Sequence, residues 1–529
     1  MLRRRREQRG PLMRRIVLWF DDRLGAATFT RRALRKAFPD HWSFMIGEIA
    51  LYCFVLLVLT GIFLSFFYIA SPREVVYRGP YEPLRGEPMS AAYESVLRIS
   101  FEVRAGLVMR QIHHWAAVVF LAAISVHVLR VFFTGAFRRP REINWIVGVT
   151  LLLLALGAGF TGYSLPDDLL SGTGVRIFYS ILLSIPLIGT WAAFLAFGGE
   201  FPSVELLGRL YAFHIFLLPA AIAAAVSVHL ALIWHQKHTQ FRAPGRREDN
   251  VVGSPLWPNY AMRSVGLMFI VFAVLALMAG VFQINPVWMY GPFDPTTVSS
   301  PAQPDWYLGW IEGALRLAPN WEIRVFGYTI PEPFVPGVLL PGVFFLLMYL
   351  WPLIERRLTG DHEDHHLLDR PRDNPLRTGI GVGILTFAAV LTLAGSNDVL
   401  GSFFRIPVEN VTRAFRIMVF LLPPLFGWIA FRVARDLRDR EAGVGERVML
   451  VRTATGGFEQ LARPPAEDGR APGRDEEWSR AQRKAGRAER RARRALRKAQ
   501  RELRKARREE RRAAREREEA NQPPEAGPP

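Results

Sequence analysis

The feature that most restricts how this chain folds is the gathering of its apolar residues into blocks of about 20. A block of that length, wound as an α-helix, spans the roughly 30 Å hydrocarbon core of a bilayer. We count eight such blocks, at residues 44–69, 108–133, 144–163, 210–234, 261–282, 336–354, 378–395 and 414–433. The sequence therefore predicts an all-α integral membrane protein with eight transmembrane helices.

A ninth apolar stretch, residues 180–198, is interrupted by Pro186 and Gly189. Charge decides its placement, because Lys and Arg favour the cytoplasmic side of a membrane. The basic N-terminus and the basic loops at 138–141 and 237–247 lie on one side only if 180–198 does not span. Eight spans also place the basic C-terminal tail on that side. We expect a multi-pass protein of the cell membrane with both termini cytoplasmic.

The net charge of +19 follows mostly from this topology and from the tail. Because the basic residues flank spans rather than forming a soluble basic domain, nucleic-acid binding is disfavoured. The single cysteine, Cys53, excludes an internal disulfide, a Cys-x-x-Cys-His haem attachment and a cysteine-ligated iron–sulfur cluster. Any redox centre held by the chain is therefore expected to use histidine. The apolar run 16–20 is too short for a cleavable signal peptide.

Four histidines lie in two of the predicted spans: His113 and His127 in the second, His214 and His229 in the fourth. On an α-helix, 14 positions return to within about 40° of the starting face and rise about 21 Å, whereas 15 positions overshoot by about 60°. His114 is 13 positions from His127, about 140° off that face. Ionisable side chains inside a membrane are costly and usually functional. We interpret the four as ligands of two haems, one above the other, with two histidines on each iron.

Glycines and arginines accompany this pattern. Two glycine pairs are each 14 residues apart, in the first and third spans: Gly47 with Gly61, and Gly148 with Gly162. Glycine allows a flat ring to approach closely, so these residues are expected to make room for two porphyrins, with helix packing as the alternative. Arg110 and Arg130 each lie three residues from a candidate ligand. They are candidates to bind haem propionates, and snorkelling to the interface is the alternative.

We divide the chain into four regions. Residues 1–43 form a basic cytoplasmic segment, with a short amphipathic helix expected around residues 12–20, and 44–240 form a dihaem four-helix core. Residues 241–434 form a second four-helix region, and 435–529 form a basic tail that is helical or disordered. Contact with anionic membrane lipid is one role for this tail, and a solvated tail without catalytic importance is the alternative.

Between the fifth and sixth spans lies Pro304-Asp305-Trp306-Tyr307. An acid, two aromatic residues and a turn-fixing proline suit a pocket that binds a ring and accepts its proton. Asp305 and Tyr307 are therefore candidate catalytic residues. Glu312, one or two helical turns further along, is a weaker candidate for the same pocket.

Taken together, residues 40–434 resemble cytochrome b of quinol:cytochrome c reductases, the bc1/b6f superfamily. The resemblance rests on the four histidines, the paired glycines, and the motifs Arg110-Gln111-Ile112-His113, Phe213-His214, Gly162-Tyr163-Ser164-Leu165-Pro166 and Pro304–Tyr307. The fused eight-span layout, Asp305 and the extended C-terminus are most similar to the actinobacterial type. There the complex carries a dihaem cytochrome c subunit, associates with an aa3 oxidase and uses menaquinol.

The resemblance implies a bifurcated reaction with two b-type haems. Quinol is oxidised on the outer side, near Asp305, Tyr307 and residues 172–175, and Asp305 accepts its proton. One electron goes to a Rieske iron–sulfur subunit, and the other to the outer haem of His113 and His214. It then reaches the inner haem of His127 and His229 and a quinone on the cytoplasmic side, coupled to proton translocation. A cytochrome c subunit, an aa3 oxidase supercomplex and a homodimer are the other implied partners.

The inner quinone site is harder to place. Many family members have a Lys-Asp pair at the start of the fifth span, where this chain reads Arg263-Ser264. Four residues are alternative proton donors: His235, Lys237, His238 and Asp249. The cluster Asp361–His366 is interpreted as a solvated loop rather than a metal site or proton antenna.

Two other functions are open to such a sequence. A dihaem membrane anchor of a dehydrogenase generally has fewer spans and lacks the Pro304–Tyr307 loop. A proton-coupled transporter predicts no haem and leaves the glycine spacing unexplained.

Overall fold

The computed structural model describes residues 12–24, 30, 33–297, 303–443, 450–452 and 458–460. Within these residues, eight helical segments are long and apolar enough to cross a membrane, as predicted. Their bounds are Trp42–Ser65, Gly106–Phe133, Glu142–Ser164, Leu206–Gln236, Leu256–Val281, Val335–Thr359, Pro375–Ala394 and Val408–Glu441. Helices suit this environment because each satisfies its own main-chain hydrogen bonds where no water is available.

The α-helices that form and connect these spans are α2 (Leu12–Leu24), α4 (Ile46–Ser65), α5 (Ala91–Phe101), α6 (Gly106–Phe133), α7 (Glu142–Ser164), α8 (Leu169–Leu183), α9 (Gly189–Phe197), α10 (Leu206–Ala212), α11 (Leu218–Gln236), α12 (Ala261–Val281), α13 (Gly309–Leu317), α14 (Leu340–Thr359), α15 (Pro375–Ala394), α16 (Asn397–Phe404) and α17 (Val408–Gly443). Shorter helical turns are η1 (Trp42–Phe44), η2 (Glu82–Leu84), η3 (Phe213–Leu217), η4 (Leu256–Tyr260), η5 (Val287–Met289), η6 (Trp306–Leu308), η7 (Val335–Leu339) and η8 (Pro371–Asp373).

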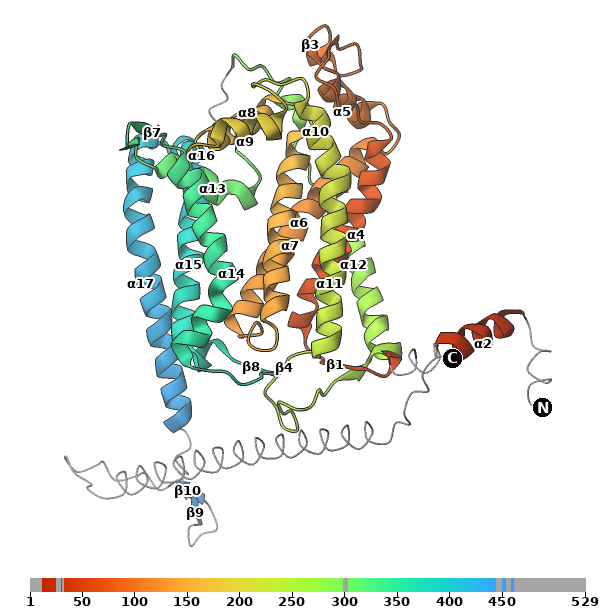
Figure 1. Ribbon diagram of the computed structural model, residues 1–529, viewed down its shortest axis with the longest axis vertical. Coiled ribbons are helices and arrows are strands. Elements are labelled where there is room, and N and C mark those ends of the chain that lie inside the picture. The colour runs from red at the N-terminus through yellow and green to blue at the C-terminus, as the bar shows by residue number, and fades with distance from the viewer. Residues whose placement is uncertain are drawn as a thin grey trace, which may run out of the picture. The chain divides into compact units, whose positions relative to one another are not determined.

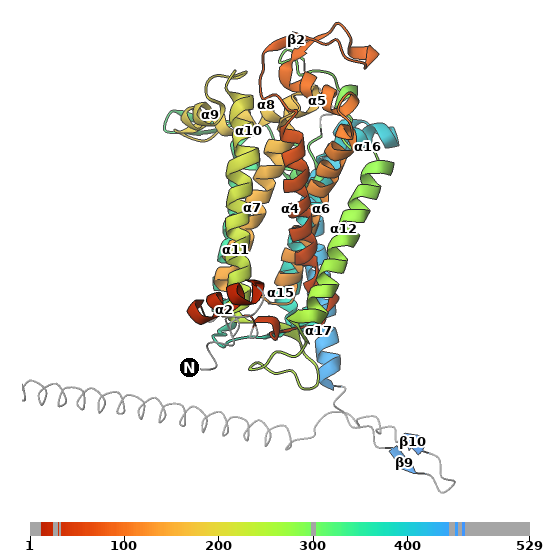
Figure 2. The same cartoon turned by 90° about the vertical axis from the view of Figure 1, so that its right-hand side faces the viewer.

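The first four spans pack as two pairs of helices. α4 lies against α6, and α7 lies against α11. Figure 2 shows the α7–α11 pair beside the α4–α6 pair, with α12 next to α4 and α6. The remaining spans extend the bundle on the other side, where α14 contacts α7 and α15 packs along α17 (Figure 1).

The interrupted apolar stretch does not form a ninth span. Its residues fall in α8 and α9, two short helices joined by a turn that contains Pro186. Both lie across one end of the bundle (Figure 1). Asp168 caps α8, since its Oδ1 accepts hydrogen bonds from the main-chain N–H groups of Leu170 and Ser171. The predicted boundary at proline and glycine is confirmed.

Short strand pairs close several loops between the helices. The antiparallel pairs are β1 (Ala37–Phe38) with β5 (Ser254–Pro255), β2 (Glu74–Val76) with β3 (Pro88–Ser90), and β6 (Ile323–Val325) with β7 (Tyr328–Ile330). β4 (Gln240–Phe241) runs parallel to β8 (Leu367–Leu368). The β1–β5 and β4–β8 pairs hold residues from the two predicted halves of the chain together at one end of the bundle.

The surface of the spans carries many large apolar side chains. Large side chains such as Leu59, Ile62, Phe269 and Phe420 are more than half exposed. In water such a surface would be a liability, but it matches the acyl chains of a bilayer. Cys53, in contrast, is fully buried in α4, as a small core residue would be.

A buried ion cluster joins the second half of the bundle to its loops. Arg377, on the first turn of α15, is fully buried and donates to Glu355 of α14 at 2.9 Å and to Asp369 at 3.1 Å. Arg138 also pairs with Asp369, at 3.0 Å. Because the charges are mutually compensated, this cluster can be buried without the penalty of an unpaired ion.

The last span continues further than the sequence predicted. α17 runs to Gly443, beyond the expected boundary at residue 434. The described residues up to Gly443 belong to one compact unit, and those beyond it belong to a second. Its described part is the antiparallel pair β9 (Leu450–Arg452) and β10 (Phe458–Gln460). The rest of the predicted basic tail, residues 461–529, lies outside the described residues.

Candidate functional site

The four candidate histidines form two facing pairs at two depths of the bundle. The rings of His113 on α6 and His214 on η3 have centroids 6.1 Å apart. The rings of His127 on α6 and His229 on α11 have centroids 6.4 Å apart. With metal–nitrogen bonds of about 2 Å, two imidazoles on opposite sides of one metal ion have ring centroids about 6 Å apart. We call the two pairs the His113–His214 level and the His127–His229 level.

A local change in helix geometry accounts for the unequal histidine spacings. His113 and His127 are 14 residues apart on a continuous α-helix, whereas His214 and His229 are 15 residues apart. His214 lies in η3, a single π-helical turn between α10 and α11. A π turn accommodates one extra residue, so it absorbs the overshoot that a 15-residue spacing would cause. Pro219 follows directly in α11, and its missing N–H favours this wider turn.

Each of the four predicted glycines faces one histidine ring. A Cβ atom built at Gly61 lies 3.3 Å from His113, and one at Gly47 lies 3.2 Å from His127. On the other helix pair, a Cβ at Gly162 lies 2.4 Å from Cε1 of His214. The corresponding distance from Gly148 to His229 is 3.8 Å. The glycines therefore make room for the imidazoles that would bind a haem.

Arg110 and Arg130 are half-buried, and each has buried donor atoms without a partner in the described part of the chain. Nε and Nη2 of each have no hydrogen-bond partner among the described residues. Arg110 also donates to the main-chain oxygen of Asn285 at 3.0 Å, and Arg130 lies over the ring of Phe44. A buried guanidinium with free donors is costly unless an anion binds it, and haem propionates are such anions. Together with the ring spacing and the glycines, these orphaned donors fit a haem at each level.

The Pro304–Tyr307 motif lies beside α6. Asp305 precedes the turn η6, and its two carboxylate oxygens contact different side chains. The hydroxyl of Tyr307 donates to Oδ2 at 3.0 Å, and Nε2 of His114 lies 3.2 Å from Oδ1. Tyr307 is buried, and Gly159 of α7 leaves the space that its ring fills. His114, which its angle on the helix excluded as a haem ligand, thus contacts the candidate proton acceptor Asp305.

Glu312 is differently engaged. It pairs with Arg316 at 2.8 Å, and Arg316 also contacts Asp398 at 3.0 Å. The predicted segment 172–175 lies in α8, and Gly172 packs against the ring of Phe293. At the start of that helix, burial raises the pKa of Asp168 to about 6, although hydrogen bonds from Ser171 and Leu170 oppose the shift.

A carboxylate that the sequence reading did not single out lies at the other end of the bundle. Glu48 follows Gly47, the residue that faces His127. Its carboxylate accepts hydrogen bonds from the hydroxyls of Tyr260, of Ser264 at 2.5 Å and of Tyr52 at 3.3 Å. No described cation forms an ion pair with Glu48. A carboxylate among hydroxyls in a membrane helix is a strong sign of function.

The four residues that the sequence suggested as proton donors at this end are less suited to that role than Glu48. His235, Lys237 and Asp249 are exposed, and Asp249 pairs with Arg247. His238 lies against Phe38, with ring centroids 4.5 Å apart. Burial, reinforced by Lys36, lowers the pKa of His238 to about 4, so this ring is neutral near pH 7. Arg263 pairs with Asp40 at 2.6 Å, while Ser264 contributes to the Glu48 cluster.

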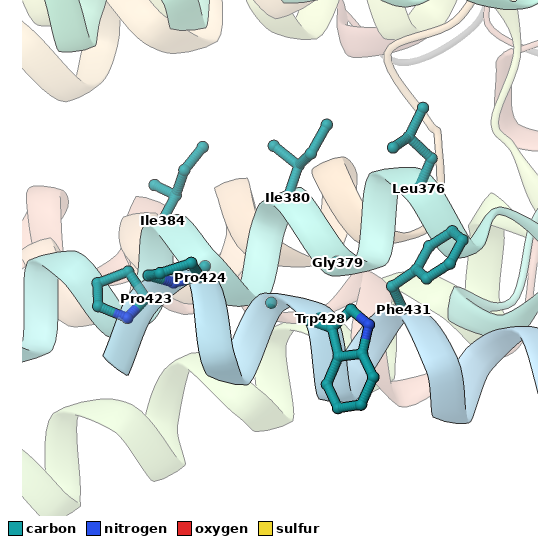
Figure 3. A pocket seen from close by; sticks show the side chains of 10 residues that line it. Leu376, Gly379, Ile380, Ile384, Pro423, Pro424, Trp428 and Phe431 are labelled. Carbon is teal, nitrogen blue, oxygen red and sulfur yellow. The ribbon is translucent and has the colours of Figure 1, made fainter. Parts of the chain in front are cut away.

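Two further features lie apart from these clusters. In the segment 361–366, His365 contacts Asp361 at 2.8 Å and His366 contacts Arg141. Among the described residues no three His, Cys, Asp or Glu side chains are grouped to bind a metal ion. An apolar groove of about 410 Å³ runs between α15 and α17 (Figure 3). Its lining includes none of the candidate site residues.

The fold and the site define a class of protein: a multi-pass membrane cytochrome of the b type. A model for the N-terminal part of cytochrome b, b6 and petB matches residues 118–292, which include three of the four histidines. The fold is also similar to a chain of a hyperthermophilic respiratory Complex III. That match has a TM-score of 0.59 and 21% identity, and covers 78% of this chain and 99% of the other. At this identity the likeness concerns the fold alone.

Curated relatives narrow the class. The cytochrome bc1 complex cytochrome b subunit of Mycobacterium tuberculosis is 49% identical over 461 residues, 86% of this chain and 84% of the relative. The same subunit of Corynebacterium diphtheriae is 49% identical over 423 residues, covering 80% and 78%. That of Streptomyces coelicolor is 46% identical over 454 residues, covering 83% and 82%. The chain belongs to this family, the cytochrome b subunits of cytochrome bc1 complexes.

Proposed function

We propose that this subunit oxidises quinol at the Asp305 end of the bundle and reduces quinone at the Glu48 end. The observation that carries the proposal is the pair of facing histidine rings at each of two depths, 6.1 and 6.4 Å between centroids. A b-type haem held at each level supplies a one-electron carrier, so that electrons can cross the bundle. His113 and His214 would hold one haem and His127 and His229 the other, so the chemistry on the substrate would belong to side chains beside them.

At the Asp305 end, the carboxylate is the base that accepts a proton from quinol. Tyr307 and His114 hold its two oxygens in place, and Trp306 supplies an aromatic surface next to it. Oxidation of one quinol releases two protons and two electrons. One electron leaves to a Rieske iron–sulfur subunit and then to a cytochrome c subunit, while the other crosses the membrane. Menaquinol is the proposed substrate, since the relatives are actinobacterial proteins.

At the Glu48 end, one quinone takes up two protons and two electrons, one electron from each of two quinols oxidised at the Asp305 end. Glu48 donates a proton to the bound quinone and is reprotonated from the adjacent aqueous side, because it lies in the first turn of α4, at the end of the span. Tyr52, Tyr260 and Ser264 hold the carboxylate at the surface of α4 and α12. Glu48 thus supplies a carboxylate at this end, where Arg263-Ser264 supplies none.

The proposed orientation places the Asp305 end outside and both termini in the cytoplasm. The basic loops at 138–141 and 237–247 then lie inside. Protons leave quinol outside and enter quinone inside. Moving each elementary charge against 100 mV stores about 2.3 kcal/mol, so the reaction conserves free energy. A homodimer and an aa3 oxidase supercomplex complete the proposed assembly.

Electron transfer to the c-type cytochrome and proton release together distinguish this function from that of a dihaem dehydrogenase anchor. The complex, purified with its Rieske and cytochrome c partners, is reconstituted in vesicles and given quinol. We expect reduction of the c-type cytochrome, acidification on the Asp305 side and stimulation of the rate by an uncoupler. Haem reduction without transfer to the c-type cytochrome would contradict bifurcation and favour the anchor.

A further inference from the structure

The residue that precedes each of the four glycines differs between the two histidine levels. At the His113–His214 level the pairs are Thr60-Gly61 on α4 and Thr161-Gly162 on α7. At the His127–His229 level the residues preceding Gly47 and Gly148 are Ile46 and Val147, which carry no hydroxyl. The same two helices thus carry a hydroxyl beside the glycine at one level and none beside the glycine at the other.

Both hydroxyls reach the ring nitrogen that faces away from the partner histidine. Oγ1 of Thr60 lies 2.9 Å from Nδ1 of His113. Oγ1 of Thr161 lies 3.3 Å from Nδ1 of His214, which is also 3.1 Å from the main-chain oxygen of Ala158. At the other level, Nδ1 of His127 has no hydrogen-bond partner among the described residues. The ring of His229 faces the main-chain oxygen of Asn144, as His214 faces that of Ala158, but no described hydroxyl reaches it.

The direction of these hydrogen bonds follows from the helix. The Thr60 hydroxyl donates its proton to the main-chain oxygen of Leu56 at 2.7 Å, and the Thr161 hydroxyl donates to that of Gly157 at 2.9 Å. A hydroxyl has one proton and two lone pairs. With the proton used by the main chain, each threonine oxygen accepts from Nδ1–H. This fixes the tautomer in which Nε2 is free to bind a metal.

An acceptor on Nδ1–H makes the imidazole a stronger electron donor to a metal on Nε2. Stronger donation favours the oxidised, more highly charged iron. Building on the proposed function, we propose that Thr60 and Thr161 lower the reduction potential of the haem at the His113–His214 level relative to the other. The threonines act through the histidines and do not touch substrate, so they are positioning residues. The resulting gradient drives electrons from the Asp305 end toward the Glu48 end.

The test is a potentiometric titration of the b-type absorbance in the purified complex. Thr60→Val and Thr161→Val remove the hydroxyl at nearly constant volume. We expect the two changes together to raise the His113–His214 potential by about 59 mV, a tenfold change in a one-electron equilibrium. The component that a His214→Asn variant loses identifies this haem, and the other component should not move.

Two further variants distinguish an effect on the haem potential from a general loss of protein stability. Val147→Thr installs the hydroxyl beside Gly148, and we expect it to lower the potential of the His127–His229 haem instead. Thr150→Val is the control, since that hydroxyl on α7 contacts Ile146 and Tyr349 and not a histidine. This inference would be overturned if both haems are present and their potentials stay unchanged in the double valine variant and in Val147→Thr. The proposed function would not be affected by that result. Absence of haem from the unmodified complex would instead overturn the proposed function.

Discussion

Nε2 of His114 lies 3.2 Å from Oδ1 of Asp305, although the two residues are 191 positions apart. The contact joins the Pro304–Tyr307 loop to α6, directly beside the histidine at the first level. The hydroxyl of Tyr307 holds the second carboxylate oxygen at 3.0 Å. Asp305 is therefore oriented by two side chains, as a base that must meet one substrate proton requires.

Replacing Asp305 with asparagine keeps the size of the side chain but removes the base. We expect Asp305→Asn to slow quinol oxidation by about 10²-fold or more, the usual contribution of general-base catalysis. The reduced-minus-oxidised haem spectra should be unchanged. Glu312→Gln is the matched control, because Glu312 already pairs with Arg316 at 2.8 Å, and its effect should be smaller. Normal turnover of Asp305→Asn would exclude this role.

The glycines offer a paired steric test on one helix. In Gly162→Ala the new Cβ would lie 2.4 Å from His214, whereas in Gly148→Ala it would lie 3.8 Å from His229. Overpacking of this kind costs about 1–3 kcal/mol and displaces the ring. We expect Gly162→Ala to lose or strongly shift one b-type component in the haem spectrum. Gly148→Ala should retain both, and equal effects of the two changes would contradict the described geometry.

At the opposite end, Glu48→Gln tests the unanticipated carboxylate. We expect quinone reduction to slow by about 10²-fold, the general-acid contribution, while oxidation at the Asp305 end begins at its normal rate. Reduced b haems should then accumulate in the steady state, which is followed by absorbance. Asp249→Asn serves as the comparison, since Asp249 is exposed and paired with Arg247. An equal effect of both changes would remove the special role of Glu48.

The buried ion cluster carries a prediction about stability. Arg377→Met leaves Glu355 and Asp369 buried without their shared partner, which costs about 3–5 kcal/mol. The melting temperature of the complex in detergent should fall clearly. Arg435→Met is the control, because Arg435 and Asp439 are both about half exposed and such pairs contribute about 0–1 kcal/mol. A Tm unchanged by Arg377→Met would show that the cluster adds nothing to stability.

Asp168 makes stability depend on pH. Because burial raises the pKa of Asp168 to about 6, the folded protein holds this proton where the unfolded chain has lost it. Stability therefore falls as pH rises from about 4 to 6, by roughly 3 kcal/mol, and the loss is complete above that range. Asp168→Asn keeps the helix cap but cannot titrate, so its Tm profile between pH 4 and 8 should be flatter. Parallel profiles would contradict this assignment.

Much of the fold follows from the sequence, since spans in a membrane are set by length and hydropathy. The eight blocks and the interrupted stretch at 180–198 needed no tertiary information. The paired positions of His113, His127, His214 and His229 followed from helical periodicity, but the π turn at His214 did not. It depends on Pro219 and on packing that a fixed rotation of 100° per residue does not describe.

Other parts of the site depend on contacts between distant segments. The sequence did not identify Glu48 as a site residue, because a single carboxylate near a helix end is usually solvated. Its hydroxyl partners Tyr260 and Ser264 lie about 212 and 216 residues away along the chain. The one sequence feature that could have pointed to Glu48 is its position next to Gly47, a glycine of the predicted haem pattern. Its angle on the helix predicted that His114 lies off the ligand stripe, but its contact with Asp305 depends on how the loop folds back onto α6.

A redox-titrated difference spectrum of the purified complex tests the central claim most directly. With pyridine haemochrome to count haem, it reports how many b-type centres the facing histidines hold. The account predicts about two haems per chain, titrating as two components at separate potentials, with His113→Asn and His127→Asn each removing a different one. One haem, or none, in the unmodified protein would contradict it.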